Sequence, residues 1–410
     1  MNDRFSAEIE RRLEEIRAQG LFRELRRVDS PQSTRVRIEG RGLLNFSSND
    51  YLGLANHPLL KEAAIKAVEK FGGGSGASRL ICGSLAPHHD LEDALAAFKK
   101  VDAALSFSSG YAAAVGTICA LVGKDDVIVL DKLVHASIVD AARLSGAKLR
   151  VFSHNDLNEL DDILRWSANR DASATGERRS QTLIVTESIF SMDGDAAPLR
   201  EIVVLKEKYG AWLMVDEAHA TGMFGKHRGG LAEALDVSDQ IEIQMGTLGK
   251  ALGSSGGYIC GSRELIEYLV NRARTFIFST APVPAAAGAA KAGVEIVQSR
   301  EGEARCKQLW SLVEQTSLAL AKIAPNHRAN RSAIIPLIFG AEENALKAAS
   351  ALREAEIFVP AIRFPTVPRN QARLRITLTA AHTDEDLANL FRALSPILVN
   401  LKSEILKSQI

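Results

Sequence analysis

Several residues of this sequence could do chemistry because of where they follow apolar stretches. Asp216 ends one such stretch and is followed by His219, Lys250 lies among glycines and small residues after another, and His135 comes just past a third. An acid at the carboxyl end of a parallel strand faces the crevice where α/β proteins bind ligands. A lysine with little local side-chain cover can bring its amine close to a ligand. For each residue alone, a surface lysine or a structural histidine is the plainer interpretation.

A further segment could bind a phosphate group. Residues 108–114 place small side chains around Gly110 and Tyr111, directly after the apolar stretch 104–107. A turn of small residues that opens a helix points free N–H groups and the positive end of the helix dipole at one spot, which suits a phosphate. A plain N-capped helix is the simpler interpretation of this segment when it is taken alone.

Two motif matches point to other enzyme classes, and both fail on the surrounding residues. Residues 216–219 spell D-E-A-H, the metal-binding box of a nucleotide-driven helicase, which also needs a phosphate loop of the form G-x-x-x-x-G-K-[ST]. At Lys250, the first glycine of that loop is replaced by Gln244 and the hydroxyl residue by Ala251. Residues 253–257 fit the hydrolase motif G-x-S-x-G, but a strand is expected after them where that motif needs a helix.

The elements that position these residues follow an alternating pattern from about residue 63. Short apolar stretches separated by helical segments, such as 201–209, are typical of a mainly parallel α/β sheet. The expected strands are 103–107, 127–130, 149–152, 183–186, 212–216, 241–245 and 258–260. The polar stretch 167–181 is expected to be an exposed loop.

Both ends of the chain have a different pattern. Apolar residues at helical spacing predict an amphipathic N-terminal helix, followed by a turn at 29–31 and a short strand at 36–38. After residue 284, a mostly helical run (285–323) leads to strands near 334–339, 357–359 and 374–378, and then to a final helix from Asp384. We therefore expect an N-terminal arm (1–60), a large domain (61–284) and a smaller α+β domain (285–410).

The candidate residues indicate a specific chemistry only when they are considered together. They place a phosphate cradle, an acid, two histidines and a lysine on successive carboxyl-side strand ends of one sheet. This set is what pyridoxal phosphate (PLP) chemistry requires, with a lysine for the Schiff base, an acid to hold the pyridine nitrogen protonated and a helix N-terminus for the phosphate. We therefore expect PLP as the cofactor and no metal.

The order of motifs resembles the α-oxoamine synthases, which are fold-type I PLP enzymes. The matching segments, spread over residues 20–395, are SNDYLGL, GSGASR, SGY, HAS, FSMDGD, VDEAHATG, TLGKALG and PTVP…ARLRITLTAAH. The resemblance implies a large, mainly parallel sheet domain with a smaller α+β C-terminal domain. It also implies a homodimer with the site at its interface, where Ser279 and Thr280 reach the neighbouring phosphate.

The resemblance further implies roles for individual residues. Lys250 binds PLP and moves the Cα proton, Asp216 pairs with the pyridine nitrogen, and His219 bonds the ring hydroxyl. Other cofactor contacts are Gly110, Tyr111, Ser191, Thr247 and His135, which stacks over the ring; substrate contacts are Arg23, Asn49, His135, Thr366 and Arg375. Tyr111 stands where many members carry Phe and Ser188 where Gly is common, and neither departure removes a catalytic group.

The activity implied is a decarboxylative condensation of an amino acid with an acyl thioester. Residues 365–383 are most similar to the branch that joins L-alanine to a pimeloyl thioester of coenzyme A or acyl carrier protein in biotin biosynthesis. Glycine C-acetyltransferase, 5-aminolevulinate synthase and serine palmitoyltransferase share the core and stay open as alternatives. A non-enzymatic regulator with this fold is a further alternative, against which His135, Arg23 and Arg375 argue.

Composition excludes several other classes of protein. The chain has 410 residues, and its 50 basic and 50 acidic residues leave no net charge, so neither nucleic acid nor an anionic membrane is expected as a partner. No apolar run reaches the length of a spanning helix, and five acids in the first twenty residues are unlike a targeting peptide. The four cysteines, Cys82, Cys119, Cys260 and Cys306, form no CxxC pair and are expected to be buried thiols. These exclusions leave a cytosolic enzyme or a soluble binding protein, and with the resemblance described above we expect a cytoplasmic enzyme.

Overall fold

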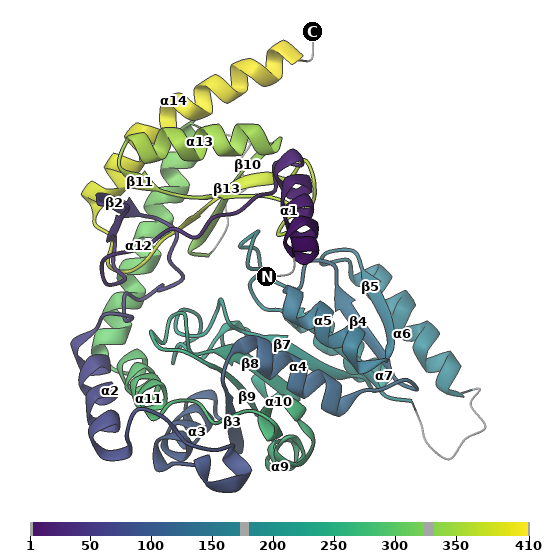
Figure 1. The fold of residues 1–410 in the computed structure, drawn as a ribbon. Coiled ribbons are helices and arrows are strands. Elements are labelled where there is room, and N and C mark those ends of the chain that lie inside the picture. Colours follow the sequence, from purple (N-terminus) through teal and green to yellow (C-terminus); the bar gives the residue numbers. More distant parts are fainter. Residues whose placement is uncertain (1–2, 173–179, 324–331, 409–410) are drawn as a thin grey trace.

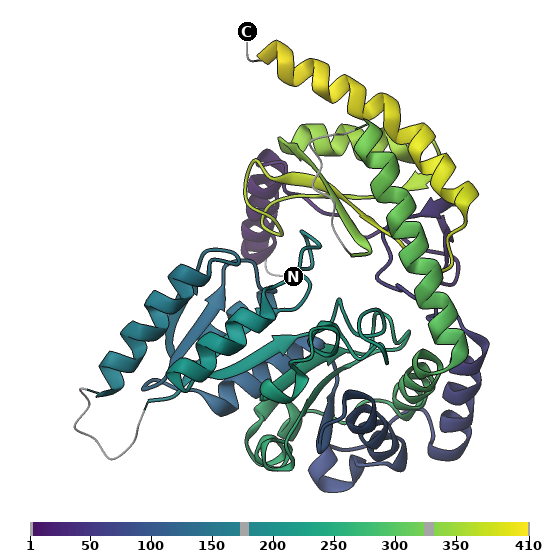
Figure 2. The same cartoon turned by 180° about the vertical axis from the view of Figure 1, so that it is seen from behind.

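The computed structural model describes residues 3–172, 180–323 and 332–408. These residues form a lower lobe around a large sheet and an upper lobe around smaller sheets, and the long helix α12 (Arg300–Ile323) runs from one lobe to the other (Figure 1). Seen from behind, α12 and α14 (Asp384–Ser408) lie against the outer side of the upper lobe (Figure 2).

The large sheet is mainly parallel, as the sequence predicts. Among the described residues it has seven strands in the order β3-β9-β8-β7-β6-β4-β5. Their bounds are Ala103–Phe107 (β3), Val127–Asp131 (β4), Lys148–Phe152 (β5), Thr182–Glu187 (β6), Trp212–Asp216 (β7), Ile243–Thr247 (β8) and Gly257–Gly261 (β9). β9 runs antiparallel to both of its neighbours, and the other neighbouring pairs are parallel. The inner strands are almost fully buried, because helices cover both faces of a sheet of this kind.

Helices connect these strands and cover the sheet. They are α3 (Ala86–Lys99), α4 (Gly110–Leu121), α5 (Ala136–Ser145), α6 (Leu157–Ala172), α7 (Leu199–Tyr209), α8 (Leu231–Ala234), α9 (Arg263–Arg272) and α10 (Arg274–Ile277), with a π-helical turn at Arg79–Gly83 and a 3₁₀ turn at Ser238–Gln240. A side chain caps the start of α4, α5 and α9: the Ser109 hydroxyl accepts from the Ala112 N–H at the start of α4, for example.

The upper lobe combines both ends of the chain. Its elements are α1 (Asp3–Ala18), β1 (Arg35–Ile38), β2 (Arg41–Asn45), β10 (Ile334–Gly340), α13 (Glu342–Glu354), β11 (Ile357–Phe358), β12 (Ala361–Ile362) and β13 (Ala372–Thr377). β2 pairs with both β1 and β11, while α11 (Pro284–Gln298) lies against α3 and α2 (Pro58–Phe71) of the lower lobe. The three-part division at residues 60 and 284 stays a prediction.

The structure corrects two boundaries. The expected loop 167–181 is helical up to Ala172, because α6 continues with Leu160 and Leu164 buried and the Ser167 hydroxyl bonded to that of Thr182; residues 173–179 lie outside the described part. The expected strand 241–245 is displaced to Ile243–Thr247, since a 3₁₀ turn precedes it and pairing with β9 extends it.

The cysteine expectation was partly wrong. Cys260 and Cys306 are buried and Cys119 is partly buried, but Cys82 is exposed in the π-helical turn. No helix in the described ranges is long and apolar enough to cross a membrane.

Candidate active site

Strand ends of the large sheet bring the candidate residues together. β3, β4, β6, β7 and β8 all run in one direction, so their carboxyl ends lie along the same edge. Asp216 is the last residue of β7, Thr247 is the last residue of β8, and Lys250 follows three residues later. His135 and Ser191 lie in the loops after β4 and β6. The expectation that these residues share one sheet edge is therefore confirmed.

Lys250 contacts a chain of polar groups at this edge. Its Nζ lies 2.8 Å from Nε2 of His219, and the Tyr51 hydroxyl lies 2.5 Å from the other ring nitrogen, Nδ1. Burial, together with the charges of Lys250 and Arg375, holds the pKa of His219 well below its usual range, so the ring is neutral. When Lys250 is an ammonium, it donates to Nε2, so the ring hydrogen resides on Nδ1 and points toward the Tyr51 oxygen. When the amine is neutral, Tyr51 can donate to Nδ1, and the ring hydrogen then resides on Nε2.

Two buried acids lie beside this lysine on neighbouring strands. Glu187 and Asp216 are Cα register partners at the ends of β6 and β7. Burial raises the pKa of Asp216, an effect that the Lys250 cation opposes, and the N–H of Ala218 donates to Asp216 Oδ1 at 2.9 Å. Burial also lowers the pKa of Lys250 to about 8, although both acids pull it upward. About a tenth of the amine is therefore neutral at pH 7, far more than for an ordinary lysine.

The start of α4 brings free backbone N–H groups to the same edge of the sheet. Gly110 and Tyr111 are in its first turn, where N–H groups have no partner inside the helix. A Cβ on Gly110 would come within 4.0 Å of the Thr247 Cβ, so α4 begins beside the end of β8. A Cβ on Gly257 would lie 2.6 Å from the Gly110 backbone, which shows how closely β9 packs here. The Tyr111 hydroxyl donates to Asp140 at 3.0 Å.

This donor set fits PLP. A lysine amine, a buried carboxylate and a neutral histidine match the aldehyde, the ring nitrogen and the ring hydroxyl, while free N–H groups at a helix N-terminus match the phosphate. His135 lies at the same edge with part of its surface exposed. Desolvation of its ring lowers the pKa of His135, the Asp216 charge raises it, and the Lys250 charge lowers it. The His135 ring is therefore close to Asp216 and Lys250 and is accessible to a ligand bound at this edge.

Arg375 connects the upper lobe to this edge. Its Nε donates to the Ser191 carbonyl at 2.6 Å, one terminal nitrogen donates to Asn49 Oδ1 at 3.0 Å, and the other lies 3.4 Å from the Tyr51 hydroxyl. The expected carboxylate contacts Asn49 and Arg375 thus lie together, next to the loop that carries Ser191.

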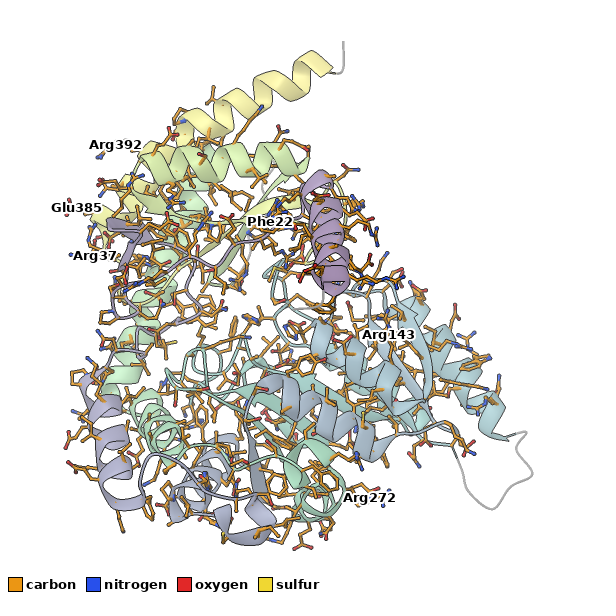
Figure 3. The ribbon with its side chains drawn as sticks, in the orientation of Figure 1. Phe22, Arg37, Arg143, Arg272, Glu385 and Arg392 are labelled. Carbon is orange, nitrogen blue, oxygen red and sulfur yellow. The ribbon has the colours of Figure 1, made fainter. Side chains whose placement is uncertain are left out.

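Arg23 and Thr366 form a separate contact. The Arg23 guanidinium lies 3.4 Å from both the Thr366 hydroxyl and the Phe364 carbonyl. Phe22, labelled in Figure 3, lies beside α1, and its carbonyl accepts from Arg363. Within the described ranges, no hydrogen bond joins this contact to Lys250.

A charged histidine ties two of the site's loops together. His154 Nδ1 lies 3.0 Å from Asp131 at the end of β4, and Nε2 lies 2.7 Å from Asp195 in the loop that carries Ser191. Burial lowers the pKa of His154, but the hydrogen bonds to Asp131 and Asp195 outweigh it and raise the pKa to about 10. The loops that carry His135 and Ser191 therefore share one ionic clamp.

We predict that His154→Gln is destabilised in a pH-dependent way. Since the folded pKa exceeds the usual value of 6.5, the stabilisation is complete below pH 6.5 and disappears as pH rises through about 10. We expect a loss of about 2–3 kcal/mol in unfolding free energy near pH 6.5, shrinking toward pH 10, measured by denaturant titration at several pH values. The matched control His89→Gln removes an exposed histidine; an equal, pH-independent loss in both variants would contradict the clamp.

Two residues of this edge were not assigned from the sequence. Tyr51 lies inside the SNDYLGL segment and Glu187 directly follows the predicted strand 183–186, so both positions carried a signal. Tyr51 contacts His219, and Glu187 lies beside Asp216 on the neighbouring strand, so both residues meet partners far apart from them in the chain. Motif spacing alone does not show such contacts.

Comparison with known proteins also indicates a PLP-dependent enzyme. The model of the aminotransferase class I and II family matches residues 41–394. An 8-amino-7-oxononanoate synthase from Geotalea daltonii is 47% identical over 94% of this chain and 96% of its own length, and one from Anaeromyxobacter dehalogenans is 48% identical over 95% of each.

Solved structures agree in fold. Serine palmitoyltransferase from S. paucimobilis, solved with PLP and myriocin bound, has a TM-score of 0.88 at 27% identity, covering 98% of this chain and 99% of that one. An 8-amino-7-oxononanoate synthase from Francisella tularensis has a TM-score of 0.72 at 28% identity, covering 88% and 99%. The chain therefore belongs to the aminotransferase class I and II family, whose members are PLP-dependent enzymes of fold type I.

Proposed function

We propose that this enzyme is an 8-amino-7-oxononanoate synthase. It condenses L-alanine with a pimeloyl thioester, and the products are 8-amino-7-oxononanoate, CO2 and the free thiol of the acyl carrier. The observation that carries this proposal is that the Tyr51 hydroxyl connects His219, which contacts Lys250, to Arg375, the group proposed to bind the amino-acid carboxylate. Relatives 43–48% identical over nearly the whole chain bear this enzyme's name.

The cofactor contacts are proposed from the geometry of the strand edge. Lys250 would hold PLP covalently, Asp216 would pair with the ring nitrogen, His219 would donate to the ring hydroxyl oxygen, and His135 would stack on the ring. Gly110, Tyr111 and Thr247 hold the phosphate end, and Ser191 contacts the ring side. When bound, PLP supplies an electron sink for negative charge on the amino-acid Cα.

The chain's own groups then bind alanine and move its proton. The Arg375 guanidinium, oriented by Asn49 and the Ser191 carbonyl, binds the alanine carboxylate by charge-assisted hydrogen bonds. The Lys250 amine, with a pKa of about 8, accepts the Cα proton in its neutral form and returns a proton to the same carbon after C–C bond formation and loss of CO2. The leaving thiolate is protonated as the carrier departs.

The acyl donor is proposed to enter beside Arg23 and Thr366. Segments 17–29 and 363–369, joined by the Arg363 contacts to the carbonyls of Gly20 and Phe22, hold six arginines and two acids. This excess of positive charge suits the phosphate groups of coenzyme A or of the arm of an acyl carrier protein. Parallel assays with the two thioesters distinguish these donors.

We further propose a homodimer that works in the cytoplasm. Large apolar side chains are exposed near the start of α4, among them Ile81 and Phe278 (79% and 71% exposed), together with Tyr111. These side chains lie in or directly after the π-helical turn, α10 and α4, and α10 contacts both other elements. Exposed apolar side chains that gather in this way suit an interaction surface, and Ser279 and Thr280, which follow α10, are proposed to reach the partner's phosphate. Sedimentation should give twice the 44.3 kDa of one chain; a monomer would contradict the dimer.

We predict that the enzyme strongly prefers the long acyl chain over the short one, and that it only weakly prefers alanine over glycine. Each buried methylene is worth about 0.8 kcal/mol, so pimeloyl thioester should exceed acetyl-CoA by about a hundredfold to a thousandfold in kcat/KM. One methyl group discriminates by only about 1–3 kcal/mol, so some turnover of glycine is expected. The measurement is free-thiol release with alanine, glycine, serine and threonine against short and long thioesters. A preference for glycine with acetyl-CoA would instead identify a glycine C-acetyltransferase.

A further inference from the structure

The buried carboxyl group of Glu187 has no role in the proposed chemistry. It ends β6, directly beside Asp216 on β7, and neighbouring strands lie about 4.7–4.9 Å apart, with register partners on the same face. Its side chain is 1% exposed. Oε2 accepts the Ser191 N–H at 3.1 Å, whereas Oε1 is buried without a well-formed hydrogen bond within the described residues. The His135 backbone N–H is nevertheless close enough to lower the pKa of Glu187, as that of Ser191 does.

Charge at this position is costly when Asp216 is ionised. Burial and the charge of Asp216 raise the pKa of Glu187 to about 8, against the opposing effect of Lys250. Tyr51 also faces Glu187, and its own pKa is raised by burial. A buried carboxylate oxygen without a well-formed hydrogen bond costs more as an anion than as a neutral hydroxyl. Two like charges on adjacent strand ends would add repulsion.

We propose that Glu187 is a positioning residue that remains protonated: Oε2 holds the backbone at Ser191, and Oε1 carries the proton. The acid pair then contributes a single negative charge, located on Asp216. The Ser191 carbonyl accepts from Arg375, so the fixed loop in turn places the group that binds the alanine carboxylate. This inference rests on the proposed cofactor site but not on the choice of acyl donor.

The test compares three holoenzymes: wild type, Glu187→Gln and Glu187→Ala. Gln has the shape of the protonated acid and still offers an oxygen to Ser191, so its PLP dissociation constant and its KM for alanine should remain within about threefold of wild type. Ala leaves the buried Ser191 N–H unpaired, and both constants should rise about 5- to 100-fold. The control variants are Glu242→Gln and Glu242→Ala. Glu242 also accepts a backbone N–H, that of Leu213, but at the opposite edge of the sheet.

A spectroscopic readout separates protonation from a purely structural role. Infrared difference spectra of wild type minus Glu187→Gln at pH 7 should contain the C=O band of a neutral carboxylic acid, and the Glu242→Gln difference should contain only carboxylate bands. A carboxylate band from Glu187, or a rise of tenfold or more in the PLP dissociation constant of Glu187→Gln, would overturn the proposal. Failure of PLP to bind wild type at all would instead refute the proposed function.

Discussion

Lys250→Ala is expected to reduce kcat by at least about 10²–10⁴-fold, the usual contribution of a positioned proton-transfer group. The amine of Lys250 is at once the covalent anchor for PLP and the group whose pKa of about 8 suits it to accept and return the Cα proton. Steady-state turnover of alanine with pimeloyl thioester measures the loss. Borohydride reduction of wild type should attach the cofactor to the peptide that contains Lys250.

The control for this variant is Lys132→Ala, which removes an exposed lysine just beyond β4 at the same edge of the sheet. We expect turnover close to wild type and unchanged labelling of Lys250. Cofactor attached to a different lysine, or residual turnover within tenfold of wild type in Lys250→Ala, would contradict the assignment of Lys250.

Asp216→Asn is expected to retain the fold and to lose about 10²–10³-fold in kcat, the equivalent of breaking a buried ion pair. The amide oxygen can still accept the Ala218 N–H, which is why the strand end should keep its conformation. The amide cannot hold the pyridine nitrogen protonated, because it lacks the opposite charge that favours the charged form. Turnover and circular dichroism together separate the chemical loss from unfolding.

Asp162→Asn is the matched control, since it removes an exposed carboxylate from α6. It should leave kcat unchanged. Near-wild-type turnover in Asp216→Asn would show that the ring nitrogen does not depend on this acid, and the partner of the nitrogen would have to be sought elsewhere, with Glu187 the next acid along the sheet.

Sequence patterns predicted the local parts of this molecule well. The strand 212–216 has the predicted bounds, and the strand ends that carry Asp216 and Lys250 lie on one edge as expected. Such features depend on residues within a few positions of one another, through apolar periodicity and turn chemistry. The same rule failed at 167–172, where the buried face of α6 outweighed the polar composition.

The sequence by itself therefore determined the alternating elements and the chemical groups at their ends. Only the tertiary structure decided which distant groups meet: Tyr51 with His219, Arg375 with the Ser191 loop, and Glu187 with Asp216. These contacts depend on the strand order β8-β7-β6-β4 and on the upper lobe lying against that edge. A strand's own residues encode its alternation and burial, but its neighbours are selected by packing of the whole chain, so no local pattern specifies them.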